Sequence, residues 1–328
     1  MTTGTFHAVT REEGGWWSGR SAAGRCRRAG RCAALLLFVT IAVPCLAVAQ
    51  TISFTFDDGF DPRTAGDAAT LNAQMLAALR DQSITTMLFP AGRRVDSPEG
   101  LRLVAQWAAA GHAIGNHSYA HRSFGARQTT VAEFTEDVER ADRLLAGMRG
   151  WTKMLRFPYL KEGDTAEKRD QLRRWMTERG YGHGYVSIDT SDWYYSQRFV
   201  AWRARDAGAS VTEFRDVYLE HLWNRATYYD RLAREVTGRS PAHVMLLHTN
   251  ALNAAFLGDV IAMFKRRGWT IVSPAEAFAD PVYARHPTTV PAGESVIWAL
   301  AKEAGNTSLR YPAEDAVYEQ PILDAKRF

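Results

Sequence analysis

Cysteine is nearly absent from the chain. Its 328 residues include only Cys26, Cys32 and Cys45, and none follows Cys45. The long remainder therefore cannot form a disulfide, offer a thiolate to a metal ion or use a cysteine nucleophile. Linkers, low-complexity tracts and internal repeats are absent as well, so nothing in the sequence divides this remainder into several domains.

An excess of charge of one sign occurs only near the start. The first 49 residues hold six of the 40 Lys and Arg residues and two of the 36 Asp and Glu residues. The other 279 residues keep 34 basic and 34 acidic groups. This balance gives no electrostatic reason to expect nucleic acid or an anionic membrane as a partner. Their number fits a single α/β barrel domain.

The first 49 residues have the pattern of a signal peptide. Arginines precede an apolar run over residues 33–43, and Ala47-Val48-Ala49 fits a signal-peptidase site, which would make Gln50 the first residue of the mature chain. We therefore expect an exported protein, located in the periplasm, the cell envelope or the extracellular space. An uncleaved membrane anchor over residues 33–49 is the alternative, although this stretch is shorter than the roughly 20 residues that span a bilayer.

Apolar runs and helical periodicity alternate along residues 50–279. Seven runs predict strands, at residues 52–56, 85–89, 112–116, 154–157, 184–188, 243–247 and 270–272. Amphipathic helices are predicted between them, at residues 71–80, 101–110, 131–148, 165–179 and 254–267. Gly111, Gly180 and Gly268 stand where a helix would end and a strand begin. The alternation predicts one α/β catalytic domain with a parallel sheet closed, or nearly closed, into a barrel.

The interval before the last strands is longer than one barrel step requires. We interpret residues 194–241 as a helical insertion with a long helix over 211–236 and several aromatic side chains: Tyr194, Tyr195, Trp202, Trp223, Tyr228 and Tyr229. These aromatics either stack on sugar rings or pack the insertion onto the barrel, and packing is the commoner arrangement. Residues 280–328, with a short helical stretch at 294–304, are expected to form a tail packed on the barrel.

Polar side chains stand at the carboxyl ends of the predicted strands. In chain order they are Asp57 and Asp58, His117, Arg156, Asp189 and Asp192, and His248. The carboxyl ends of barrel strands meet at one rim, where catalytic groups of α/β barrels gather. Each residue alone has an ordinary explanation, such as a turn for Asp-Asp-Gly. Their common placement instead predicts a single pocket.

Two motifs contain the ligands of a metal site. Asp57 and Asp58 are adjacent carboxylates, and His117 and His121 lie four residues apart. One carboxylate and two imidazoles make three protein ligands and leave a position for water, as in catalytic zinc sites. A divalent ion lowers the pKa of that water towards neutrality. The second carboxylate is then a spare base, and the set predicts a hydrolase.

Five short motifs follow one another along most of residues 52–278. They are Thr55-Phe56-Asp57-Asp58-Gly59, His117-Ser118-Tyr119-Ala120-His121, Arg156-Phe157-Pro158-Tyr159, Asp189-Thr190-Ser191-Asp192-Trp193 and Leu246-Leu247-His248. In this order they resemble the polysaccharide deacetylase family, the group with the NodB homology domain, also called carbohydrate esterase family 4. The resemblance implies a distorted (β/α)7-type barrel, in agreement with the seven strands counted independently.

The resemblance implies a role for each residue of the first two motifs. Asp57 would be the general base, and Asp58 would bind the metal together with His117 and His121, while Ser118 braces the loop. Neighbouring side chains on a regular strand point to opposite faces, so the two aspartates are not expected to chelate one ion together.

The third motif implies two further roles and contains one departure from the family pattern. Arg156 would orient Asp57 and lower the pKa of that carboxyl, so that it is ionised at neutral pH. Tyr159 would offer its backbone N–H to the oxyanion. The family usually continues with glycine, and Leu160 stands there instead, which is expected to narrow the groove or move the Tyr159 loop.

The last two motifs imply the general acid and part of the substrate groove. His248 would be the acid and Asp192 would keep it protonated. Trp193 would line the groove, and Leu246 would contact the acetyl methyl group. Thr249 stands where the family commonly has an aspartate, so the support of His248 is expected to differ.

Together these observations predict a metal-dependent deacetylase. The expected substrate is an acetylated polysaccharide that contains N-acetylglucosamine, such as peptidoglycan, chitin-like polymers or poly-N-acetylglucosamine. One divalent ion is implied, with Zn²⁺ as the default and Co²⁺, Ni²⁺ or Mn²⁺ as alternatives. No organic cofactor, nucleic acid or protein partner is expected. An O-acetyl esterase on xylan or a similar glycan and a non-catalytic glycan-binding relative are the competing hypotheses.

Overall fold

The computed structural model describes residues 50–328. The predicted signal peptide or anchor at residues 1–49 lies outside this range. Among the described residues, no helix combines the length and the apolar character needed to cross a membrane.

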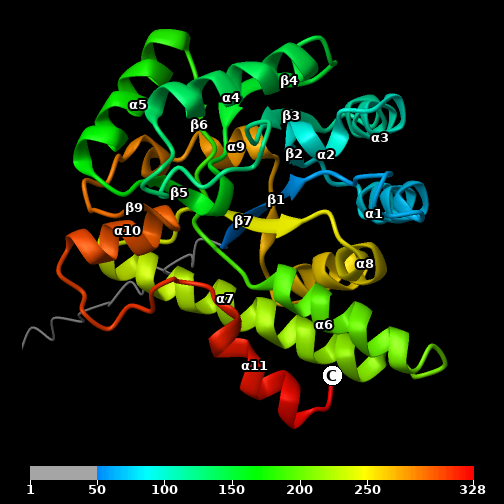
Figure 1. The fold of residues 1–328 in the computed structure, drawn as a ribbon. Coiled ribbons are helices and arrows are strands. Elements are labelled where there is room, and N and C mark those ends of the chain that lie inside the picture. Colours follow the sequence, from blue (N-terminus) through cyan, green and yellow to red (C-terminus); the bar gives the residue numbers. More distant parts are fainter. Residues whose placement is uncertain (1–49) are drawn as a thin grey trace, which may run out of the picture. The chain divides into compact units, whose positions relative to one another are not determined.

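A parallel sheet forms the centre of the described fold (Figure 1). Its seven strands are β1 (Thr51–Asp58), β2 (Met87–Pro90), β3 (Ala113–Asn116), β4 (Trp151–Leu155), β6 (Gly182–His183), β7 (Ala242–His248) and β8 (Thr270–Ile271). They are ordered β6-β4-β3-β2-β1-β7, and β8 pairs with the first two residues of β1. The central strand β1 is buried on both faces, which is typical of a parallel sheet covered by helices.

Helices surround the sheet in the alternation that the sequence predicts. They are α1 (Ala68–Asp81), α2 (Gly92–Val95), α3 (Pro98–Ala109), α4 (Val131–Leu145), α5 (Ala166–Arg179), α8 (Ala251–Arg266) and α9 (Pro274–Phe278). Local signals set several of their ends. Thr130 and Glu133 form a capping box at the start of α4, and Gly180 ends α5 in the left-handed conformation, with φ 71°.

The stretch at 184–188, which was predicted to be a strand, instead crosses between the two edges of the sheet. At its start, the Gly184 N–H donates to the Leu155 carbonyl of β4 (2.7 Å). At its end, Ile188 forms a parallel bridge to Met245 of β7. The stretch has different partners at its two ends, so it cannot form a regular ladder with either strand. The sheet is therefore curled and nearly closed, which is the distortion expected of this barrel.

The insertion consists of α6 (Asp192–Arg205) and α7 (Thr212–Thr237). Its aromatic side chains pack inwards: Tyr195 and Tyr229 are at most 1% exposed, and Trp202, Trp223 and Tyr228 are half-buried against the main core. The packing interpretation of these aromatics therefore holds. The sequence analysis did not identify α6.

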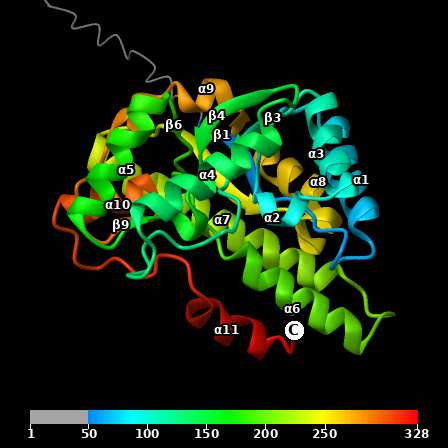
Figure 2. The ribbon, with the colours of Figure 1, turned by 45° about the horizontal axis from the view of Figure 1, so that its top comes forward.

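The residues after α9 cover one side of the barrel. The turn η2 (Pro281–Ala284) leads to β9 (Ala292–Gly293), which pairs with β5 (Lys161–Gly163) directly after the turn η1 (Pro158–Leu160). Helix α10 (Val296–Glu303) packs on α7, and α11 (Ala316–Ala325) contacts α6. Both views show α11 in red beside the α6–α7 pair (Figures 1 and 2).

Candidate active site

Three side chains come together at the carboxyl rim of the sheet. Asp58 ends β1, and His117 and His121 belong to the loop after β3. One ligand atom from each lies within 4.8 Å of those of the other two. Asp58 Oδ1 and His121 Nε2 are 3.4 Å apart, which is about the separation of two ligands held at roughly 2.0–2.1 Å in a tetrahedron. Asp58 Oδ1 is also buried without a hydrogen-bond partner, so the donor set fits a small divalent cation.

The surroundings of His117 prepare it to act as a ligand. Its Nδ1–H donates to the Arg156 carbonyl oxygen (2.8 Å), which leaves the Nε2 lone pair free to face the site. Burial, followed by the nearby His121 charge, holds the pKa of His117 well below its ordinary value. The imidazole is therefore neutral, which is the form that binds a metal.

Strained backbone is concentrated around this trio. Asp58 (φ 86°), Ser118 (φ 57°), His121 (φ 55°), Tyr159 (φ 57°) and Leu160 (φ 54°) all have left-handed conformations although none is glycine. Each such residue costs on the order of 1–3 kcal/mol and persists only where its surroundings enforce it, typically at functional sites. The left-handed Asp58 also explains how two successive aspartates of one strand end can serve different purposes.

Asp57 stands beside the trio without belonging to it. It is 1% exposed, and its Oδ2 lies 3.6 Å from His117 Nε2. Burial raises the pKa of Asp57 to about 6, although the Arg156 charge opposes this rise. The expectation that this pKa would be lowered overall is therefore wrong, because removal from water outweighs the guanidinium. With a pKa of about 6, the carboxyl is still mostly ionised at pH 7.

Arg156 holds Asp57 from the sheet side. The guanidinium is completely buried, and it donates to Asp57 Oδ1 (3.0 Å), to Thr55 Oγ1 (3.1 Å) and to the Gly184 carbonyl. It also stacks over the Phe89 ring, 4.3 Å from the centroid. The carboxylate therefore has one fixed rotamer.

His248 ends β7 and is paired with Asp192 at the start of α6. Its Nδ1–H donates to Asp192 Oδ1 (2.7 Å), and its backbone N–H donates to Asp192 Oδ2 (2.9 Å). Burial alone lowers the pKa of His248, but the Asp192 charge and hydrogen bond outweigh it and raise the pKa to about 10. The imidazole is therefore a cation at neutral pH, which can donate a proton.

Two asparagines and Thr249 complete this region, and the sequence analysis did not identify either asparagine. Asn250 and Asn253 donate their side-chain N–H groups to Asp192 Oδ2 (3.0 and 2.8 Å). Asn250 also caps α8, so its position before the predicted helix was a usable signal. Thr249 donates from its backbone N–H and its hydroxyl to the Asp57 carbonyl (3.1 and 3.2 Å), and it thereby braces the end of β1 rather than His248.

The residues expected to bind substrate line the rim to different degrees. Tyr159 is 60% exposed and packs edge-on against His121, with ring centroids 4.8 Å apart. Leu246 is 5% exposed on β7, and Trp193 is half-buried against Tyr194. Their contacts with substrate remain predictions.

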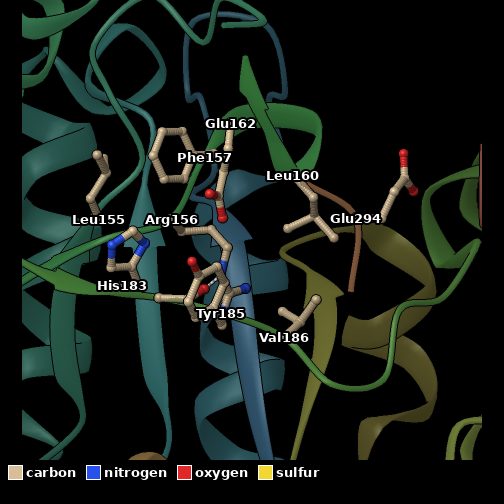
Figure 3. A pocket seen from close by; sticks show the side chains of 10 residues that line it. Leu155, Arg156, Phe157, Leu160, Glu162, His183, Tyr185, Val186 and Glu294 are labelled. Atoms are coloured by element: carbon tan, nitrogen blue, oxygen red, sulfur yellow. Dashed lines mark hydrogen bonds between the residues drawn. The ribbon is translucent and has the colours of Figure 1, made fainter. Parts of the chain in front are cut away.

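An open groove begins at the ligand trio. It has a volume of about 870 Å³ and is lined by His121, Tyr159 and Lys161, among others. A second cavity lies behind Arg156, between Leu160, Glu162 and His183, and has a volume of about 10 Å³ (Figure 3). This is room for about one water molecule, so only the groove can accommodate a sugar.

Comparison with known proteins agrees with the resemblance seen in the sequence. Residues 47–174 match the family model described as polysaccharide deacetylase. A curated relative, a peptidoglycan-N-acetylglucosamine deacetylase of Bacillus cereus, is 27% identical over 143 residues. That match covers 43% of this chain and 46% of the relative, so the chain spans about half the length of the curated relative it matches.

Solved structures share the fold. A polysaccharide deacetylase from Bacillus cereus superposes with a TM-score of 0.50 and 22% identity, over 67% of this chain and 90% of that one. A carbohydrate esterase family 4 pseudoenzyme from Bacillus anthracis gives a TM-score of 0.49 and 17% identity, over 70% and 66% of the two chains. The first comparison and the curled parallel sheet confirm the (β/α)7-type fold class.

Proposed function

We propose, from the premise that the chain belongs to the polysaccharide deacetylase family, that it is a metal-dependent hydrolase that removes N-acetyl groups from a polysaccharide containing N-acetylglucosamine. One observation carries this proposal. The trio of Asp58, His117 and His121 lies beside an uncoordinated buried carboxylate, Asp57, and the rim also holds a protonated imidazole, His248. A family member without activity would not need this base and this acid together.

Peptidoglycan is the substrate that we favour. The matched relative is described as a peptidoglycan-N-acetylglucosamine deacetylase, and the first 49 residues have the pattern of an export signal. We propose that the protein works in the periplasm, in the cell envelope or outside the cell. Amino-terminal sequencing of the exported protein tests this: a chain beginning at Gln50 supports cleavage, and a chain that keeps residues 33–49 supports an anchor.

The metal ion is proposed to sit between the three ligands. When bound, a divalent cation there would lower the pKa of water and withdraw electron density from the acetyl carbonyl. Asp58, His117 and His121 supply one carboxylate and two imidazoles, for which zinc is the default.

The side chains around the ion would move the protons. Asp57, held in one rotamer by Arg156, takes a proton from the attacking water. The Tyr159 N–H faces the oxyanion, a type of contact worth roughly 3–4 kcal/mol for each donor. His248 then gives its proton to the nitrogen of the departing amine, and the Asp192 carboxylate stabilises the imidazolium until that step.

Acetate release tests the proposal. The protein is stripped with a chelator, reloaded separately with Zn²⁺, Co²⁺, Ni²⁺ or Mn²⁺, and assayed on peptidoglycan, chitooligosaccharides and acetylxylan. We expect release from an N-acetylated polymer that is lost with the chelator and restored by a metal. Release from acetylxylan alone would favour an O-acetyl esterase, and no release from any polymer would favour a glycan-binding protein.

Asp57→Asn separates chemistry from metal binding. The variant keeps all three ligands and should bind zinc as the wild type does, but it should lose turnover because the amide cannot accept the proton. Full deacetylation by Asp57→Asn would show that another group is the base.

A further inference from the structure

Helix α7 of the insertion places two buried polar side chains behind the Asp192–His248 pair. Tyr218 is 0% exposed and His221 is 6% exposed, and neither belongs to any of the five motifs. Buried polar groups of this kind are held by specific partners. Following those partners leads from α7 to Asp192 by two separate routes.

The first route runs through Asn253. The Tyr218 hydroxyl donates to Asn253 Oδ1 (2.7 Å). This contact assigns the amide oxygen to one side, so that the amide nitrogen donates to Asp192 Oδ2 (2.8 Å) and to the His248 carbonyl (2.8 Å). Without the hydroxyl, a flipped amide would turn its oxygen towards the Asp192 carboxylate.

The second route runs through the peptide just before Asp192. The Ser191 N–H donates to His221 Nε2 (3.3 Å), and His221 Nδ1 faces Glu319 Oε2 of α11 (3.2 Å). The Tyr195 hydroxyl donates to the same Glu319 oxygen (3.0 Å). Although burial raises it, the pKa of Glu319 is lowered overall by the hydrogen bonds from His221 and Tyr195. The carboxylate therefore selects the His221 tautomer whose Nε2 can accept.

A second glutamate of the tail reaches the same turn. Glu314 Oε2 accepts from the Ser191 hydroxyl (3.3 Å), and Glu314 Oε1 accepts from Arg225 (3.1 Å) and from Tyr229 (3.2 Å) of α7. The tail, α7 and the start of α6 are thus joined by one buried polar network that ends one residue before Asp192.

We propose that Tyr218 and His221, with Glu319 behind His221, are positioning residues that hold the Asp192 carboxylate in line with His248. They touch neither substrate nor metal. The insertion and the tail would therefore support the general acid, in place of the aspartate that the family commonly has at the position of Thr249. The kinetic consequence rests on the proposed function, whereas the positioning itself can be measured without turnover.

A misplaced Asp192 would stabilise the imidazolium less. The groups whose charges act on His248 come from three places: Asp192 on α6, with Asp189 just before it, Asp57 and Asp58 at the end of β1, and the imidazoles of His117 and His121 after β3. Asp192 contributes most among the groups that raise its pKa, against the opposing effect of burial. Loosening this carboxylate should therefore lower the pKa of His248.

The direct test is an NMR titration of the His248 ring in the full chain with zinc added, with the signal assigned from its loss in His248→Gln. Tyr218→Phe removes only the hydroxyl. His221→Phe keeps a ring to stack on Tyr195 but removes the acceptor of the Ser191 N–H. The matched control is Tyr181→Phe, which loses an equally buried hydroxyl bonded to Asp142 on the other side of the barrel.

We expect the pKa of His248 to fall by about 1 unit in Tyr218→Phe and in His221→Phe, and to stay unchanged in Tyr181→Phe. Acetate release should then fall about 5-fold at pH 10 and less than about 2-fold at pH 7.5, because a 1-unit fall from about 10 deprotonates the acid mainly at high pH. KM should not change. A merely structural role would lower activity at every pH.

The outcomes separate this inference from the proposed function. An unchanged His248 pKa in either folded variant would overturn the role assigned to that residue, and an unchanged pKa in both would overturn the inference. Should neither wild type nor variants release acetate while the pKa still falls, the proposed function would be wrong and the positioning network would stand. Tyr218→Phe is conservative enough to fold even if His221→Phe does not.

Discussion

The clearest consequence of the structure concerns Asp192→Asn. Asp192 is completely buried and accepts four hydrogen bonds, of which two come from His248. An amide removes the negative charge and turns an N–H group towards at least one of these donors. Because burial is the largest influence on His248 and acts downwards, the pKa of the imidazole should drop from about 10 to below its ordinary 6.5.

The size of the effect follows from this difference. A fall of more than about 3 pKa units corresponds to about 4–5 kcal/mol, which is close to the 3–5 kcal/mol typically lost when one partner of a buried ion pair is removed. The folded-state pKa of His248 is raised, so the pair's contribution to stability is fully present below pH 6.5 and is lost as the pH rises through about 10. The variant should therefore be several kcal/mol less stable than the wild type at pH 6, and the gap should shrink towards pH 10.5.

Urea unfolding at both pH values measures this gap, and acetate release at pH 7.5 should fall by about 10²–10⁴-fold. The control is Asp230→Asn. Asp230 pairs with His243 Nε2 (3.3 Å) at the other end of β7, but burial keeps the pKa of His243 below its ordinary value. Its destabilisation should therefore show no comparable loss between pH 6.5 and 10.5. A pH-independent gap for Asp192→Asn, or activity within tenfold of the wild type, would refute the reasoning.

Three further predictions are simpler. His117→Ala removes a ligand and should weaken zinc binding more than about 100-fold in a chelator competition; unchanged affinity would place the metal elsewhere. Arg156→Gln removes the charge that opposes the burial of Asp57, so the acidic limb of the pH–activity profile should move up by about 1–2 units; a limb that stays in place would argue against Asp57 as the base. Thr130→Ala breaks the capping box of α4 and should cost about 0.5–2 kcal/mol in thermal unfolding, with activity kept.

Periodicity was sufficient to predict most of the fold. Strands β1 and β7 lie within one residue or so of the predicted runs because long apolar stretches bounded by polar residues leave little choice of boundary. The stretch at 184–188 was the failure. It is as apolar as a strand, but its hydrogen bonds go to two different strands, and this is a tertiary property that no local pattern contains.

Helix α6 was missed for a related reason. Its sequence begins with Asp192 and Trp193 and is rich in aromatic residues, which are only moderate helix formers. What makes it a helix is its packing: Tyr195 and Phe199 are buried against α7 and α8, and Arg198 is held by the end of the chain. Tertiary contacts outweigh local propensity there.

The candidate site was predictable where function is written in short motifs. Asp58, His117 and His121 come from two motifs about 60 residues apart, and the parallel sheet brings them to one rim. The direction of the pKa shift of Asp57 was not predictable, because it depends on how much water the folded chain excludes from that carboxyl. The sequence names the neighbouring arginine but not the depth of burial.

The supports of the site were the least visible part, and the reason is geometric. A catalytic group must reach the substrate, so it stands at a strand end beside other motif residues. A supporting group needs only to reach another side chain, and Tyr218, His221 and Glu319 do so from a helix and a tail that are 26 to 127 residues from Asp192 in the sequence. Their positions in an insertion and a terminal segment, parts that are usually regarded as decoration of a barrel, follow from that freedom. A chain that has lost the usual neighbour of its catalytic histidine can therefore recover the same electrostatic support from elements that no motif describes.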